Sequence, residues 1–177
     1  QVWANDVSGA PYGTDKPIGY FTYTLLHPSQ PGTVYVQLEE VSGDQASCLA
    51  IDFEAPGLRQ FDFNASGSPT QPPEATPANP IGYIGVLPSD LTSPSVGYGW
   101  VTSPSSFNRG AQTSPAYSNL LQDGAGASSA HDFRVQLPVG VYEATVTFGD
   151  PNFARDQMNV SLVTGHGTSG DLSPVTG

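Results

Sequence analysis

Cationic side chains are scarce in this sequence. Five Lys and Arg residues stand against sixteen Asp and Glu residues, which gives a formal net charge of −11 at pH 7. A field of this sign repels polyanions, so we expect no nucleic-acid partner. The surplus of carboxylates makes calcium, which prefers oxygen ligands, the cofactor to consider.

Cysteine is almost absent, and long apolar runs are absent altogether. Cys48 is the single cysteine, which excludes an internal disulfide and a multi-thiolate metal site. Its strand-like surroundings, Ser47 to Ile51, allow two interpretations: a buried small hydrophobe or the partner in an intermolecular disulfide. No run of about 18 apolar residues occurs, so we expect no membrane insertion.

Glycine and proline are plentiful, and helical spacing is nearly missing. The 20 Gly and 17 Pro residues are spread along 177 residues, which favours many short strands joined by turns in one domain. Eight Tyr and eight Phe residues predict an aromatic core. Apolar and polar residues alternate with the period of two that is typical of half-buried strands. This pattern covers residues 20–26, 34–39, 49–54, 132–137, 141–148 and 158–162.

The connections between these runs carry further predictions. Pro138-Val139-Gly140 forms a turn, so strands 132–137 and 141–148 are expected to pair as a hairpin. Residues 66–80 and 87–106 are long loops rich in Pro, Ser, Thr and Gly, and 115–122 is expected to hold one short helical turn.

Several short motifs follow one another from residue 61 onward. They are Phe61-Asp62-Phe63, Ser68-Pro69, Gly97-Tyr98-Gly99-Trp100, Arg109, Leu120-Leu121 with Asp123, Phe133 to Pro138, Gly140-Val141-Tyr142, Gly149-Asp150-Pro151 and Asp156-Gln157-Met158. Their order resembles a galactose-binding-like, malectin-like jelly roll of large secreted bacterial proteins, also found beside polysaccharide-degrading hydrolases. Asn64 departs from the Gly usual after the first motif. The resemblance implies an all-β jelly-roll sandwich of two antiparallel sheets with long loops, secreted or displayed on the cell surface.

The closing strands of this family stand at the front of the chain instead of at its end. The resemblance places them in residues 1–60, with the main body in 61–177, so that 1–177 forms one sandwich unit. Two explanations remain: a circular permutant that closes its own sheets, or a tandem array in which one unit completes its neighbour by strand exchange. In an array, Trp3, Tyr20, Phe21 and Tyr23 are the interface candidates.

Loop aromatics are the candidates for sugar recognition. An exposed ring can stack on the apolar face of a pyranose, which suggests Trp100, Tyr98 and Tyr83, with Arg109 beside them. The alternative is that Trp100 plugs the core, with its flanking glycines permitting tight turns.

Metal ligation and catalysis have weaker signals. Asp150, Asn152 and Asp156 could supply oxygen ligands to Ca²⁺; the alternative is a turn capped by Asx hydrogen bonds, with Arg155 pairing one acid. The histidines, His27, His131 and His166, lie in turn-rich stretches, and no local catalytic motif appears. We therefore expect no enzyme. Two glycosylation sequons begin at Asn64 and Asn159.

Two functions are compatible with these features. The first is a structural module of a cell-surface array or filament, which assembles with identical or similar units through strand sharing or end-to-end contacts. The second is a carbohydrate-binding module of a larger secreted protein, with polysaccharide as its partner.

Overall fold

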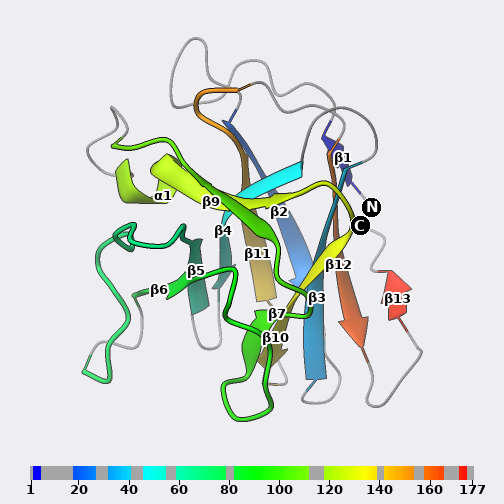
Figure 1. The fold of residues 1–177 in the computed structure, drawn as a ribbon. Helices are drawn as coiled ribbons and strands as arrows, with labels where there is room; N and C mark the ends of the chain where they lie inside the picture. Colours follow the sequence, from blue (N-terminus) through cyan, green and yellow to red (C-terminus); the bar gives the residue numbers. More distant parts are fainter. Residues whose placement is uncertain are drawn as a thin grey trace.

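The chain forms a two-layer β-sandwich in a computed structural model, which describes residues 2–4, 18–26, 32–40, 46–54, 59–78, 82–111, 118–138, 142–153, 158–165 and 172–174. Two sheets pack against each other, and one short helix, α1 (Ser118–Gln122), lies among the described residues (Figure 1). The all-β prediction is confirmed, and α1 falls inside the expected helical turn.

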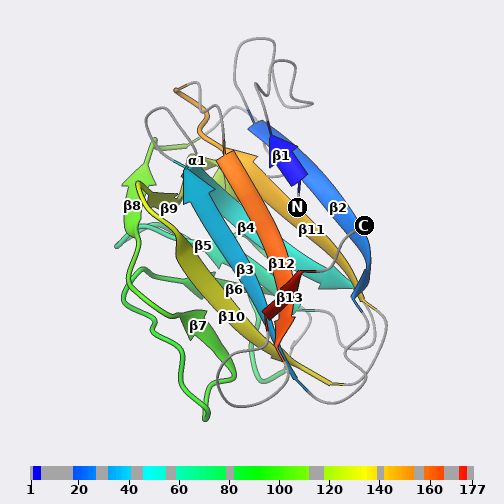
Figure 2. The ribbon, with the colours of Figure 1, turned by 90° about the vertical axis from the view of Figure 1, so that its right-hand side faces the viewer.

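The first sheet contains six strands. Its order is β1 (Val2–Ala4), β12 (Met158–Gly165), β3 (Gly32–Glu40), β10 (His131–Leu137) and β7 (Tyr98–Trp100), with β13 (Leu172–Pro174) also paired to β12. Figure 2 shows β1, β12, β3 and β10 side by side across this layer. All its pairs are antiparallel.

The second sheet contains seven strands. Its order is β2 (Ile18–Leu26), β11 (Tyr142–Gly149), β4 (Ala46–Glu54), β5 (Arg59–Phe63) and β6 (Tyr83–Val86), while β9 (Asp123–Ala127) pairs with both β4 and β8 (Ser105–Asn108). The expectation of purely antiparallel sheets was wrong in one place, because β5 and β6 run parallel. The Pro-rich segment after Phe63 carries the chain back before β6 begins, which a hairpin turn would not do.

The predicted hairpin between 132–137 and 141–148 was also wrong. β10 pairs with β3 and β7 in the first sheet, whereas β11 pairs with β2 and β4 in the second. The chain therefore changes sheets after Pro138, and the Tyr142 hydroxyl donates a 3.0 Å hydrogen bond to the Pro138 carbonyl across this corner. Alternation of apolar residues predicts a strand with one buried face, but it does not say in which sheet that strand lies.

The described strands of residues 1–60 pair with the rest of the same chain. β3 lies between β12 and β10, and β4 lies between β11 and β5. The first and last strands both pair with β12, β1 along Met158–Val160 and β13 along Val163–Gly165. No neighbouring unit is needed to complete these pairs, which favours closure within one chain over strand exchange.

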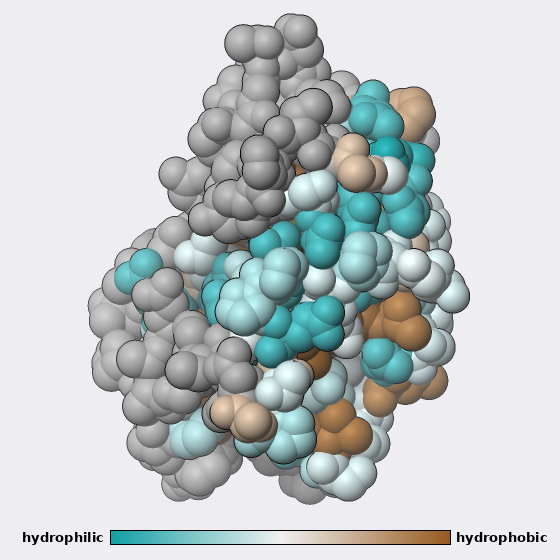
Figure 3. All heavy atoms as spheres, turned by 90° about the vertical axis from the view of Figure 1, so that its left-hand side faces the viewer, coloured by the Kyte–Doolittle hydropathy of each residue, from teal (hydrophilic) through white to brown (hydrophobic). Residues whose placement is uncertain are grey.

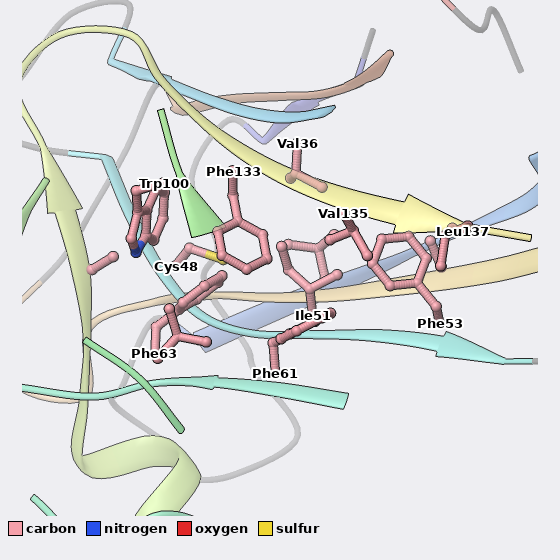
Figure 4. Close-up of a cluster of buried hydrophobic side chains, with 14 of the residues drawn as sticks. Val36, Cys48, Ile51, Phe53, Phe61, Phe63, Trp100, Phe133, Val135 and Leu137 are labelled. Carbon is pink, nitrogen blue, oxygen red and sulfur yellow. The ribbon is translucent and has the colours of Figure 1, made fainter. Parts of the chain in front are cut away.

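The core lies between the two sheets and is largely aromatic. Phe61 and Phe63 of β5 meet Phe133 of β10 with ring centroids 5.2 Å and 4.9 Å apart (Figure 4). Val36 and Phe53, from the first sixty residues, belong to the same cluster. Cys48 is fully buried and free, so it behaves as a small hydrophobe and is closed to intermolecular disulfide formation in the folded protein.

Candidate functional site

Trp100 does not lie in an exposed loop. It is 1% exposed on β7, and its ring packs 4.9 Å from Phe63 and 5.1 Å from Phe133. Trp100 as a sugar-stacking residue is therefore wrong, and the core-plug alternative holds. The glycines beside it explain the misleading pattern: Gly99 has φ +139°, and a Cβ there would meet the Thr92 nitrogen at 2.6 Å and the Asp90 oxygen at 2.8 Å. The chain needs glycine to pass this close, and the strand is only three residues long.

The two tyrosines proposed for sugar stacking are both partly buried. Tyr98 packs against the core with its ring 5.2 Å from Phe61. Burial raises the pKa of the Tyr98 hydroxyl, with a smaller contribution from Asp90. Tyr83 begins β6, and its backbone bonds with Pro73 and Ala75 tie that strand to the Pro-rich segment.

Arg109 forms an ion pair with a buried carboxylate. Its guanidinium binds the fully buried carboxylate of Asp150 through Nε at 3.0 Å and Nη2 at 2.6 Å. The same group lies between the rings of Phe107 and Phe153, at 4.9 Å and 4.6 Å from their centroids. Arg109 thus joins β8 to the chain that follows β11, through the Nε and Nη2 groups that donate to Asp150.

Two of the three residues predicted to bind calcium, Asp150 and Asn152, lie at the same corner. Asp150 Oδ1 accepts a 3.0 Å hydrogen bond from the Asn152 backbone, and Arg109 neutralises its charge. This is the Asx-capped turn given as the alternative, and its Asp150 carboxylate pairs with Arg109. Asp156 lies outside the described residues. Within the described part of the chain, no group of three or more His, Cys, Asp and Glu residues is arranged to hold a metal ion.

A small polar pocket lies where the 92–97 loop meets β10. It has a volume of about 150 Å³ and is lined by Thr92, Ser93, Pro94, Gly97, Arg134 and Gln136. None of the four residues predicted for sugar binding lines it. The sequence carried one signal for this pocket: Arg134 and Gln136 alternate with the inward row Phe133, Val135 and Leu137, so they were expected on the outer face of the strand.

Backbone hydrogen bonds hold the 92–97 loop, here called the pocket loop, in place. Thr92 donates to the Trp100 carbonyl at 2.8 Å, and Trp100 donates to the Asp90 carbonyl at 2.9 Å. Gly97 donates to the Ser93 carbonyl at 3.0 Å, and its own carbonyl accepts from Gln136 at 2.7 Å. The wall of the pocket is therefore attached at both ends to strands of the first sheet, and the site is formed before any ligand arrives.

Two buried carboxyl groups anchor the chain that follows β5. Asp62 Oδ2 accepts from the Gln71 backbone and Asp123 Oδ2 from the Ala65 backbone, both at 2.7 Å. Burial raises the pKa of Asp62 to about 8, opposed by the Gln71 hydrogen bond and reinforced by the charges of Asp123 and Asp52. Burial likewise raises the pKa of Asp123 to about 6. Sequence reasoning missed this pair, because alternation alone predicts that a polar residue between Phe61 and Phe63 faces water.

The histidine among the described residues does not form a catalytic triad. His131 Nδ1 lies 3.1 Å from Thr102 Oγ1, and its Nε2 lies 3.5 Å from Ser129 Oγ. The neighbouring Asp132 instead accepts a 3.0 Å hydrogen bond from Gln37. The serine–histidine contact is long and exposed, and the polar pocket described above contains neither residue.

The remaining predicted residues are placed by backbone pairing alone. Trp3 lies opposite Asn159 in the β1–β12 ladder. Tyr20, Phe21 and Tyr23 lie on β2, opposite Thr147, Val146 and Ala144 of β11. His27, His166 and Arg155 lie outside the described residues. At the first sequon, Asn64 is 5% exposed and donates to Thr70 Oγ1 at 2.9 Å, so the fold closes it to a glycan.

The described surface has no dominant apolar patch in the view of Figure 3, which shows the side of the sandwich that carries α1, β5 and β6. Hydrophilic residues prevail there, with separate hydrophobic spots. No helix in the described ranges has the length and hydrophobicity required to cross a membrane.

Comparison with known proteins gives one partial match. A protein of Bacillus subtilis (strain 168) named "Uncharacterized esterase YxiM" is 38% identical over 96 residues, which cover 54% of this chain and 22% of that protein. The chain thus spans less than a quarter of the relative's length. No family model matches the chain, and no solved structure matches it. The fold is a β-sandwich, and the similarity is to part of a protein that carries an esterase name.

Proposed function

We propose that this chain is a non-catalytic carbohydrate-binding module of a longer secreted protein. The observation that carries the proposal is the preformed polar pocket between the 92–97 loop and β10. Residues with hydroxyl, amide and guanidinium groups line it together with Pro94, and such groups recognise the hydroxyls and ring oxygens of a sugar.

The size of the pocket sets the expected ligand. Its volume of about 150 Å³ is small beside the roughly 300–1,000 Å³ of pockets that enclose a whole small-molecule ligand. We therefore propose that one residue of an extended polysaccharide enters it, while the rest of the glycan lies along the surface. Affinity per site is expected to be modest, because few contacts offset the cost of association.

The partial relative supports an accessory role. Since the match covers only 22% of the protein named as an esterase, most of that protein lies outside the region shared with this chain. We propose that the esterase activity belongs to that other part, and that the shared region serves as a binding module beside it. The structural role in an array or filament stays a prediction.

The first test is glycan binding by the 177-residue chain. A glycan array followed by calorimetric titration of the best polysaccharide should detect binding, and Gln136→Ala should weaken it roughly tenfold, as expected for one lost hydrogen bond. Gln136 is exposed, so this change should leave the fold intact. Ser106→Ala, at an exposed residue of β8, is the matched control. Silence of the array, or equal affinity of Gln136→Ala and the parent chain, contradicts the proposal.

The second test addresses catalysis. The chain should hydrolyse p-nitrophenyl acetate no faster than buffer does, because no nucleophile, base and orienting acid converge among the described residues. Turnover that disappears in Ser129→Ala or His131→Ala would instead place an esterase site at their contact.

A further inference from the structure

β2 differs from the other outer strands of the described sheets. It lies at one end of the seven-stranded sheet and pairs with β11 from Ile18 to Leu26. Among the residues that the structure describes, no strand pairs with its other side. A strand in this position presents a row of backbone donors and acceptors that another strand can pair with.

Two of the protections usual for sheet edges, short length and Lys or Pro residues, are missing from β2. Outer strands are generally kept short or carry Lys or Pro. The other outer strands described, β1, β6, β7, β8 and β13, are three or four residues long, whereas β2 has nine. Its sequence, IGYFTYTLL, contains no charged residue and no proline. β2 is therefore a long, uncharged edge in a chain whose net charge is −11.

We propose that β2 pairs antiparallel with the β2 strand of a second copy of this chain, which joins two seven-stranded sheets into one. The strand is complementary to itself about Thr22. A two-fold axis there sets Thr22 against Thr22, Phe21 against Tyr23, Tyr20 against Thr24 and Ile18 against Leu26. Thr–Thr, aromatic–aromatic and paired apolar neighbours are the cross-strand combinations that stabilise sheets.

The charge of the molecule favours β2 over charged surfaces as the place where two copies meet. Two copies of net charge −11 repel each other, and the repulsion is smallest where neither brings a charge to the contact. A two-fold contact uses the same surface on both partners and closes after two copies. The ladder between β2 and β11 is regular from Ile18 to Thr24, and its irregularity falls only at Leu25, so the backbone around Thr22 is suited to a further strand.

Sedimentation analysis of the whole chain over a wide concentration range tests the pairing. A reversible monomer–dimer equilibrium is expected. Thr22→Lys should raise the dimer dissociation constant roughly tenfold or more, because it sets two like charges opposite each other. Thr22→Glu should do the same, and a mixture of the Lys and Glu variants should restore a dimer. Ser106→Lys, which adds the same charge to the exposed edge strand β8, should leave the equilibrium unchanged.

A cysteine scan tests the axis independently of these charges. Thr22→Cys should form an interchain disulfide under mild oxidation, since the two side chains meet across the axis, whereas Thr24→Cys should not. A parent chain that stays monomeric at every concentration, a Thr22→Lys variant that dimerises as the parent does, or equal crosslinking of both cysteine variants would overturn the proposal. Because none of these measurements uses a glycan, their outcome is independent of the proposed function.

Discussion

At the scale of single residues, the environment of Arg109 decides its role. The sequence shows an arginine in a loop, which suits a ligand contact as well as an ion pair. In the structure Asp150 is fully buried, and Arg109 supplies the countercharge from between two aromatic rings. The role of Arg109 depends on Asp150, which lies 41 positions away, so the sequence gives no local signal for that role.

Removing Arg109 should destabilise the protein strongly. Arg109→Ala leaves a buried carboxylate without its cation, which costs about 3–5 kcal/mol of unfolding free energy. Arg109→Lys should also destabilise, since an ammonium group cannot reproduce the two-nitrogen contact. Urea denaturation measures both changes. Arg109→Ala combined with Asp150→Asn should recover part of the loss, because the uncompensated charge is gone. Unaltered stability of Arg109→Ala would refute the structural role.

Trp100 shows the same limit at the residue scale. Its neighbours Gly97 and Gly99 are typical of an exposed loop, yet its ring lies in the core. Strand β7 is too short for alternation to be visible, and the pairing with β10 that buries the ring comes from 33 positions further on, at Phe133. The outer-face residues of β10, by contrast, followed directly from alternation along a seven-residue strand.

At the scale of elements, the pocket loop depends on close backbone approach at Gly99. Gly99 and Gly110 both have positive φ, but a Cβ at Gly99 meets backbone atoms within 3 Å, whereas a Cβ at Gly110 meets nothing within 4 Å. A comparison of substitutions at Gly99 and Gly110 therefore distinguishes the cost of backbone strain from the cost of a steric clash.

Alanine at these glycines should have unequal effects. Gly110→Ala should cost about 1 kcal/mol of stability from backbone strain alone. Gly99→Ala should cost clearly more and should also weaken glycan binding, since the 92–97 loop must move away from β7. Thermal unfolding together with binding titration measures both effects. Equal losses of stability in the two variants would show that the backbone contacts at Gly99 are not restrictive.

Element pairing was the part of the fold that the sequence left open. The strands were recognisable because each of the long ones buries one face, which imposes a period of two. The pairing partners of these strands were not recognisable, because the apolar rows of β10 and β11 would suit a strand in either sheet. The short turn after Leu137 suggested a hairpin, and only the packing of both rows into one core shows that the chain crosses between layers.

At the scale of the whole molecule, stability should depend on pH through Asp62 and Asp123. Their pKa values in the folded protein are about 8 and about 6, both above the ordinary value of about 3.9 for an unfolded chain. Between these limits the folded state holds protons that the unfolded state has released. The unfolding free energy should therefore be highest near pH 4 and fall as the pH rises towards 8.

Asp62→Asn checks this assignment. Denaturation midpoints measured from pH 4 to pH 8 should fall with pH in the parent chain, and the slope above pH 6 should flatten in the variant because Asp62 no longer titrates. Glu143→Gln, at an exposed residue of β11, should keep the parent slope. A parent chain whose stability rises steadily over this interval would show that both carboxyl groups are ionised in the folded state.

The sequence by itself determined that this protein is built from strands around an aromatic core, because burial of one strand face leaves a local, periodic record in the chain. It also indicated that strands of residues 1–60 close a sandwich with the body of 61–177, but it left open whether they do so within one chain or in a neighbouring unit. Only the tertiary structure decided which strands pair, why Trp100 is buried, and which groups meet at the polar pocket. Those outcomes depend on contacts between distant residues, for which a single sequence carries no local record.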